Sequence, residues 1–105
     1  MAKVIEYEKK YVNEAQVELD ARFPKEELKF VAFVIKIPES DEFLISRVNN
    51  KDFSQYKWGK GMAMNAQRFI RLKVAQKIAK EIGKGATAEI LFEGNTIFMS
   101  ICETK

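Results

Sequence analysis

The most regular alternation of apolar and polar residues in this chain lies near its C-terminus. Ala86–Glu93 and Thr96–Glu103 flank Gly94 and Asn95, a pair that is typical of a two-residue hairpin turn because glycine takes a positive φ without steric cost. With this turn, one face of the hairpin is wholly apolar and the other is mixed. The sequence therefore predicts a C-terminal β-hairpin (86–93, 96–103) whose apolar face covers the core. The facing pairs predicted on that face are Phe92 with Ile97, Ile90 with Met99, and Ala88 with Ile101.

A second pattern, with the period of an α-helix, precedes the hairpin. Asn65 is a favourable N-cap, the following residues are mostly strong helix formers, and Gly83 is the type of residue that most often ends a helix. These signals predict one long helix over residues 66–82. Its apolar residues and its lysines fall on opposite arcs, which indicates a helix that covers the core with one face. The apolar arc holds Leu72, Val74, Ala75, Ile78, Ala79 and Ile82, and the polar arc holds Lys73, Gln76, Lys77 and Lys80.

The N-terminal half of the chain is predicted to supply strands. Ala15–Phe23 alternates apolar and polar residues, which is the pattern of a half-buried antiparallel strand. Lys29–Ile37 is apolar on both faces, as expected of a central strand, and Glu42–Val48 returns beside it after a polar turn. Lys3–Lys9 is interpreted as a further strand, at an edge of the sheet.

These elements together predict the fold class. Phe53–Trp58 fits either a short strand or an ordered loop, and Met62 and Met64 fit alternate inward residues of one last short strand before the helix. No repeat or linker divides the chain. We therefore expect a single α+β domain over residues 1–105, with a twisted antiparallel sheet of about five to seven strands and one long helix.

Composition narrows the class further. An apolar fraction of 47% with 31% charged residues is ordinary for a soluble globular protein, and no run approaches the length of a membrane-spanning helix. We expect a cytoplasmic protein with no membrane partner. Cys102 is the single cysteine and histidine is absent, which excludes an intramolecular disulfide and the usual zinc sites. Because edge strands of a small sheet tend to pair, we also expect a homodimer or a higher closed oligomer.

A catalytic site has little support in the sequence. Histidine is absent, and neither Cys102 nor any serine has an obvious general base beside it. Carboxylates that share a strand face or a turn could hold a divalent cation, but the same arrangement is typical of a solvated strand face or a polar turn. We therefore expect no enzyme activity and no cofactor. The carboxylate sets are Glu18 with Asp20, and Glu39 with Asp41 and Glu42.

Positive charge is concentrated in one third of the chain. Between Lys51 and Gly85 there are nine basic residues against two acidic ones, whereas the whole chain has a formal net charge of +3. Aromatic residues, Phe53 among them, alternate with these cations. The combination suits single-stranded nucleic acid, because cations follow the phosphates and rings stack on the bases. The candidate binding residues are Arg47, Lys51, Tyr56, Lys57, Trp58, Lys60, Arg68, Arg71, Lys73 and Lys77.

Each part of this pattern has a second interpretation. Phe53 and Tyr56 also fit the core of a protein that neighbouring lysines keep soluble, and the lysine stripe of the predicted helix also fits a solvated face. Arg68 and Arg71 fall toward the apolar side of the first helical turns. There their guanidinium groups would either reach along the sheet or extend from the core edge into water.

One segment resembles a known family. The run from Lys60 to Leu72 (KGMAMNAQRFIRL), preceded by a hairpin around Phe33–Val48, resembles the last strand and helix of the positive-cofactor type of transcriptional coactivator. The similarity covers at most Lys29–Ile82. Proteins of this type, and the Whirly proteins similar to them, curve a β-sheet over a dimer-forming helix and bind single-stranded DNA with basic and aromatic residues. The resemblance implies binding positions at Lys57, Trp58 and Lys60, before the Lys-Gly turn, and at Arg47 on the preceding strand.

Two functions are compatible with these patterns. The first is a small nucleic-acid-binding protein that prefers single-stranded DNA or RNA and uses a basic and aromatic surface. The alternative is an accessory or inhibitory protein that binds an acidic protein partner through its basic helix or a sheet edge. Charge would steer either kind of association, and salt would weaken it. The nucleic-acid function is favoured because rings accompany the cations.

Overall fold

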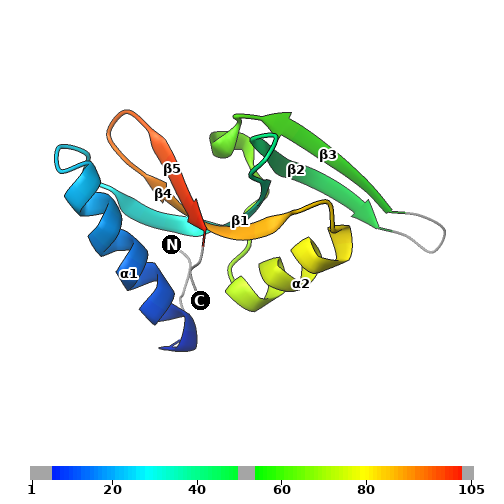
Figure 1. The fold of residues 1–105 in the computed structure, drawn as a ribbon, viewed down its shortest axis with the longest axis horizontal. Helices are drawn as coiled ribbons and strands as arrows, with labels where there is room; N and C mark the ends of the chain where they lie inside the picture. The colour runs from blue at the N-terminus through cyan, green and yellow to red at the C-terminus, as the bar shows by residue number, and fades with distance from the viewer. Residues whose placement is uncertain (1–5, 50–53, 103–105) are drawn as a thin grey trace.

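The computed structural model describes residues 6–49 and 54–102, which form two helices, a short 3₁₀ turn and five strands. In chain order they are α1 (Glu6–Arg22), β1 (Lys29–Ile37), β2 (Glu42–Asn49), β3 (Ser54–Lys60), η1 (Ala63–Asn65), α2 (Leu72–Ile82), β4 (Thr87–Glu93) and β5 (Phe98–Cys102). The strands make one antiparallel sheet in the order β3-β2-β1-β4-β5, which confirms the α+β class. The two helices lie on the same side of the curled sheet, with α1 at one end of the long axis and α2 between it and the β2–β3 hairpin at the other end (Figure 1). Within the described ranges, no helix is long and apolar enough to cross a bilayer.

The strands predicted at the N-terminus are wrong, because this segment is the helix α1. Its buried positions are Glu8, Val12, Ala15 and Leu19, whose spacings of four, three and four residues follow a helical stripe rather than a strand. Val17, which the alternating pattern assigned to the core, is 71% exposed. Of the strand predicted at 3–9, residues 6–9 are helical and the remainder lies outside the described part of the chain. The described sheet therefore has five strands rather than as many as seven.

The centre of the sheet contains an interruption that the sequence did not predict. β1 and β2 form a register only at their turn, where Lys36 faces Phe43, and further along β1 takes a different partner. The backbone N–H of Phe33 donates to the carbonyl of Phe69 at 2.9 Å, and the N–H of Phe69 donates back at 2.8 Å. On the other side of the gap, the N–H of Gln67 donates to the carbonyl of Leu44 at 2.8 Å. The segment 66–69 thus lies between β1 and β2.

This insertion explains why the second helix begins later than predicted. Ala66 has the extended dihedrals φ −62° and ψ 143°, and α2 begins only at Leu72. Helix propensity in residues 66–71 is overridden, because their backbone groups complete the sheet instead. Asn65 ends the 3₁₀ turn and does not cap α2, and the strand predicted at Met62 and Met64 is absent from the described residues. The predicted end is confirmed, since the helix stops before Gly83 with φ 71°.

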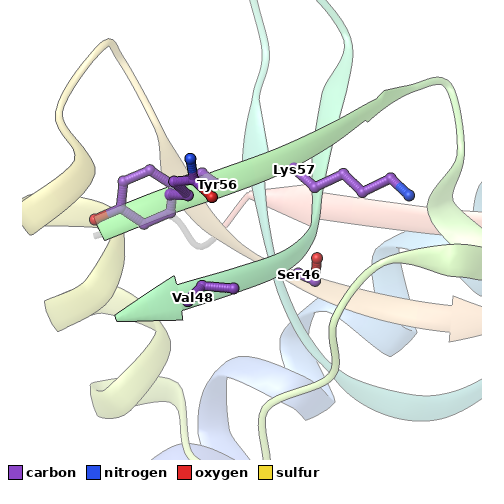
Figure 2. A pocket seen from close by; sticks show the side chains of 5 residues that line it. Ser46, Val48, Tyr56 and Lys57 are labelled. Carbon is purple, nitrogen blue, oxygen red and sulfur yellow. The ribbon is translucent and has the colours of Figure 1, made fainter. Parts of the chain in front are cut away.

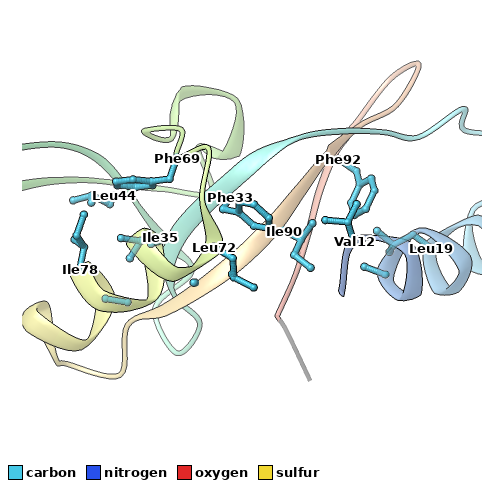
Figure 3. Packing of buried hydrophobic residues seen from close by; sticks show 14 of the residues in the cluster. Val12, Leu19, Phe33, Ile35, Leu44, Phe69, Leu72, Ile78, Ile90 and Phe92 are labelled. Atoms are coloured by element: carbon cyan, nitrogen blue, oxygen red, sulfur yellow. The ribbon is translucent and has the colours of Figure 1, made fainter. Parts of the chain in front are cut away.

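The core has a large and a small part, on opposite faces of the sheet. The large cluster lies between the sheet and the two helices, and its buried side chains come from α1, α2 and three of the strands (Figure 3). The small cluster lies on the other face, where η1 and the residues after it cover Val34, Phe43 and Leu91. Fully or almost fully buried members of the large cluster include Leu19, Phe33, Ile35, Leu44, Leu72, Ile90 and Phe92.

The C-terminal hairpin is confirmed, with a shifted turn. The N–H of Gly94 donates to the carbonyl of Ile97 at 2.8 Å, so that Asn95 and Thr96 are the turn residues rather than Gly94 and Asn95. Each residue therefore faces a partner two positions later than predicted. Because side chains alternate with a period of two, this shift leaves every side chain on its predicted face. The apolar face packs on the core, and its pairs are Phe92 with Met99 and Ile90 with Ile101.

Glu26, in the loop after α1, accounts for the position of this turn. Its carboxylate accepts the hydroxyl of Thr96 at 2.7 Å and the N–H of the same residue at 3.0 Å. A Cβ at Gly94 would meet the ends of the Glu26 and Leu28 side chains, which would have to shift to make room for it. The hydroxyl and then the backbone N–H of Thr96 hold the pKa of Glu26 below its ordinary range.

The inserted segment gives a test of stability. Phe69→Ala should lower the free energy of unfolding by about 3–5 kcal/mol, because it empties the space next to Phe33 in the large cluster. Ile70→Ala is the matched control: this neighbour is 59% exposed, and its loss should change stability by no more than about 0.5 kcal/mol. Urea unfolding followed by tryptophan fluorescence measures both. Equal effects of the two substitutions would contradict the structure.

The turn gives a test of pH dependence. The pKa of Glu26 is lower in the folded than in the unfolded chain. The stability that Glu26 contributes is therefore complete when the pH is above the pKa of the unfolded chain, and it is lost as the pH falls through the pKa of the folded chain. Unfolding of the native protein should therefore become easier below a pH of about 4.3, the ordinary value for glutamate. The Glu26→Gln variant should lack this loss of stability at low pH, because glutamine does not titrate. Glu27→Gln, a change at the exposed neighbour, should keep the native profile in thermal melts recorded across this range.

Candidate nucleic-acid interface

The hairpin of β2 and β3 carries most of the predicted aromatic and basic residues. In its register Arg47 faces Tyr56, Ser46 faces Lys57 and Leu44 faces Trp58, with an extra residue, Ile45, making a bulge. β3 is an edge strand of the sheet. The strand alternative predicted for this segment is thus confirmed from Ser54 onward. The predicted site residue Lys51 and the nearby aromatic residue Phe53 lie outside the described residues.

Alternation along β3 separates its rings from its exposed lysine. Tyr56 and Trp58 are half-buried and pack against the large cluster, whereas Lys57 between them is exposed. The interpretation of Tyr56 as a core residue is therefore correct for one side of its ring. The other side remains accessible to a ligand. Arg47, opposite Tyr56 on β2, is also half-buried.

A shallow hollow of about 350 Å³ lies over this hairpin. It is lined by Ser46, Val48, Gln55, Tyr56 and Lys57. Tyr56 and Lys57 extend from β3 toward opposite ends of the hollow, and Val48 and Ser46 lie beside them on β2 (Figure 2). The hollow thus combines an aromatic ring, a hydroxyl, an amide and an ammonium group. These are the groups with which proteins stack bases, bind base edges and contact phosphates.

The other predicted cations lie on three different elements. Lys60 is exposed at the end of β3. Arg68 and Arg71 are exposed in the connection before α2 rather than in its first turns, and Arg71 occupies the N-cap position. Lys73 and Lys77 are exposed on α2 itself. The structure therefore gathers Arg47, Tyr56 and Lys57 on one hairpin but places the helix lysines on a separate surface.

Charge is distributed unevenly along the long axis of the molecule. Residues 54–85, which include β3 and α2, contain eight basic residues and one acidic residue. α1 contains five acidic and three basic residues. The Cα trace extends 46 Å along its longest axis and only 29 and 25 Å across it, with α1 at one end and the β2–β3 hairpin at the other (Figure 1). The acidic helix α1 therefore lies far from the hairpin that carries Lys57 and Lys60.

Glu8 is an important residue that the sequence analysis missed. It is completely buried, and its Oε2 accepts the backbone N–H of Lys73 at 3.2 Å, in the first turn of α2. The same oxygen lies 3.9 Å from Nε of Arg71. α2 has no side-chain cap of its own, so a carboxylate from α1 supplies the negative charge that a helix N-terminus favours. The sequence does contain a sign of this position, because the spacing from Glu8 to Leu19 is that of one helix face. The prediction of strands in this segment hid that pattern.

The candidate metal-binding carboxylates have partners within the protein. The hydroxyl of Ser40 donates to Glu42 at 2.8 Å, and Lys36 lies 3.1 Å from Asp41. In α1, Arg22 pairs with Glu18 and Gln16 donates to Asp20. The ranges that the structure describes contain no cluster of three or more residues able to hold a metal ion.

Comparisons with protein-family models, with curated proteins and with solved structures found no match. A functional interpretation must come from the residues and their geometry.

The contact between Glu8 and α2 gives a third test. Glu8→Ala should lower the free energy of unfolding by about 1–3 kcal/mol, because the N–H of Lys73 and the Arg71 side chain lose their acceptor in a buried place. Glu8→Gln should cost less, since its amide oxygen still accepts the N–H. Glu14→Ala, at an exposed position of the same helix, serves as the control and should change little. Chemical unfolding of the three variants would detect the order, and an unaffected Glu8→Ala variant would contradict the described contact.

Proposed function

We propose that this protein binds single-stranded nucleic acid through the β2–β3 hairpin and the neighbouring basic surface. The observation that supports this most strongly is the concentration of eight basic residues against one acidic residue in residues 54–85. Phosphates are the polyanion that such a surface attracts most generally. The excess of positive charge alone would suit an acidic protein equally well. The groups that line the hollow favour the nucleic acid over the acidic protein.

The hollow over the hairpin favours a nucleotide. Tyr56 offers a partly exposed ring, while the hydroxyl of Ser46 and the amide of Gln55 suit hydrogen bonds to base edges. Lys57 lies where an adjacent phosphate would be neutralised. A duplex hides its base faces by stacking, so a site of this kind prefers an unpaired base. The partial resemblance to single-stranded-DNA-binding coactivators supports the same proposal, since it assigns binding positions to Arg47, Lys57, Trp58 and Lys60.

The proposal is tested by titrating labelled single-stranded DNA and RNA oligonucleotides at two salt concentrations, with a duplex as competitor. Tyr56→Ala or Trp58→Ala should weaken binding by about 1–3 kcal/mol, the value of one lost base stack, with little change in salt dependence. Because both rings also pack on the core, Tyr56→Phe and Trp58→Phe are needed as variants that keep a ring. They should bind nearly as well as the native protein.

The lysines should behave differently from the rings. Lys57→Ala should reduce the slope of log affinity against log salt by about 0.7, the value for one phosphate contact on a single strand. Lys77→Ala tests in the same way whether the strand continues onto α2. Lys10→Ala, at an exposed position on α1, is the control and should leave the slope unchanged. Absence of binding to either nucleic acid at low salt, together with binding to an acidic polypeptide such as polyglutamate, would replace the proposal with the acidic-partner function.

A further inference from the structure

The two edges of the sheet differ in their protection against pairing with other strands. β3, at one edge, carries the exposed Lys57 and Lys60 and lies against a strand with a bulge at Ile45. Exposed lysines and bulges are devices that keep an edge from pairing with another sheet. β5, at the other edge, has the sequence FMSIC, without charge, proline or glycine. In the described ranges no strand pairs with the outer side of β5.

The hydrogen bonds of the hairpin show which backbone groups of β5 point away from β4. The N–H of Gly94 donates to the carbonyl of Ile97, and from this bond onward the residues of β5 alternate between two directions. Met99 and Ile101 direct their backbone groups to β4. Phe98, Ser100 and Cys102 direct theirs to the open edge. These three alternate positions bond to no other strand within the described ranges.

The sequence of β5 is complementary to itself in antiparallel orientation. With Ser100 opposite its own copy, Phe98 lies opposite Cys102, and both belong to the outward-bonding set. Met99 then faces Ile101 of the other copy. Both of these side chains belong to the apolar face that packs on the large cluster. Pairing in this register brings no like charges together and extends the apolar layer from one copy to the next.

We propose that β5 pairs antiparallel with β5 of a second copy of this chain, about a two-fold axis at Ser100. The interface is isologous, because each copy contributes the same strand, and the pairing closes after two copies. It joins the two five-stranded sheets into one and removes the unprotected edge. β3, with its lysines, becomes the outer edge on both sides. The dimer does not depend on the proposed binding of nucleic acid.

Sedimentation velocity over a series of concentrations provides the first test. The native protein should form a species with twice the monomer mass of 12.1 kDa. Ser100→Pro should shift it to the monomer, because proline removes the outward N–H at the axis and leaves the backbone bonds to β4 in place, although it also removes the hydrogen bond from the Ser100 hydroxyl to Glu89 of β4. Ser100→Thr, which keeps the N–H and the hydroxyl, should remain dimeric. A native protein that is monomeric at every concentration would overturn the proposal, as would a dimer that Ser100→Pro leaves intact.

Cross-linking gives a second test, which remains informative if the proline variant fails to fold. In a Cys102→Ser background, Ser100→Cys places two thiols opposite each other across the axis. Facing Cα atoms in such a pair are about 5.5 Å apart, within the range of a disulfide. Mild oxidation should convert this variant to a covalent dimer on non-reducing gels. Lys57→Cys in the same background is the matched control on the other edge. Cross-linking there instead of at Ser100 would place the interface on β3 and reject the proposal.

Discussion

The fold depends on satisfying the backbone hydrogen bonds of two strands that separate inside the protein. β1 and β2 are paired at their turn, and beyond it Phe33 and Leu44 lie in the buried interior without each other as partners. An unsatisfied buried backbone group costs about 1–3 kcal/mol. The segment that contains Gln67 and Phe69 supplies the missing donors and acceptor. Because that segment must be extended, it also fixes where α2 begins and holds the β2–β3 hairpin at an angle to the remaining strands.

Local patterns predicted the elements whose partners are close in the sequence. The C-terminal hairpin, the β1 and β2 strands and the end of α2 at Gly83 all follow from periodicity and turn chemistry. The errors arise where distant residues decide. The first residues after Asn65 have high helix propensity but serve the sheet, and the hairpin turn shifts because Glu26, about seventy residues away, binds Thr96. Ala15–Phe23 satisfies both a strand pattern and a helical one, and the exposure of Val17 with the burial of Glu8 and Val12 distinguishes them.

The candidate site was predictable in composition but not in arrangement. The sequence shows that cations and rings gather between Lys51 and Gly85. It does not show that, in the β2–β3 hairpin, Tyr56 points toward the core side while Lys57 remains exposed. It also does not show that the helix lysines lie on another element. Nor does any local motif reveal that a carboxylate of α1 lies at the start of α2. The contact between Glu8 and Lys73 spans 65 residues of sequence.

The uneven distribution of charge along the molecule has a consequence before any contact is made. Residues 54–85 hold eight basic residues and one acidic residue, whereas α1 holds five acidic and three basic residues, so an approaching polyanion attracts the first group and repels the second. Orientation then begins at separations comparable to the Debye length, about 8 Å at physiological ionic strength. Salt shortens that distance, so it slows productive encounter even when every bond in the final complex is unchanged. A charged partner therefore meets the protein in a preferred orientation, which is set before any contact forms.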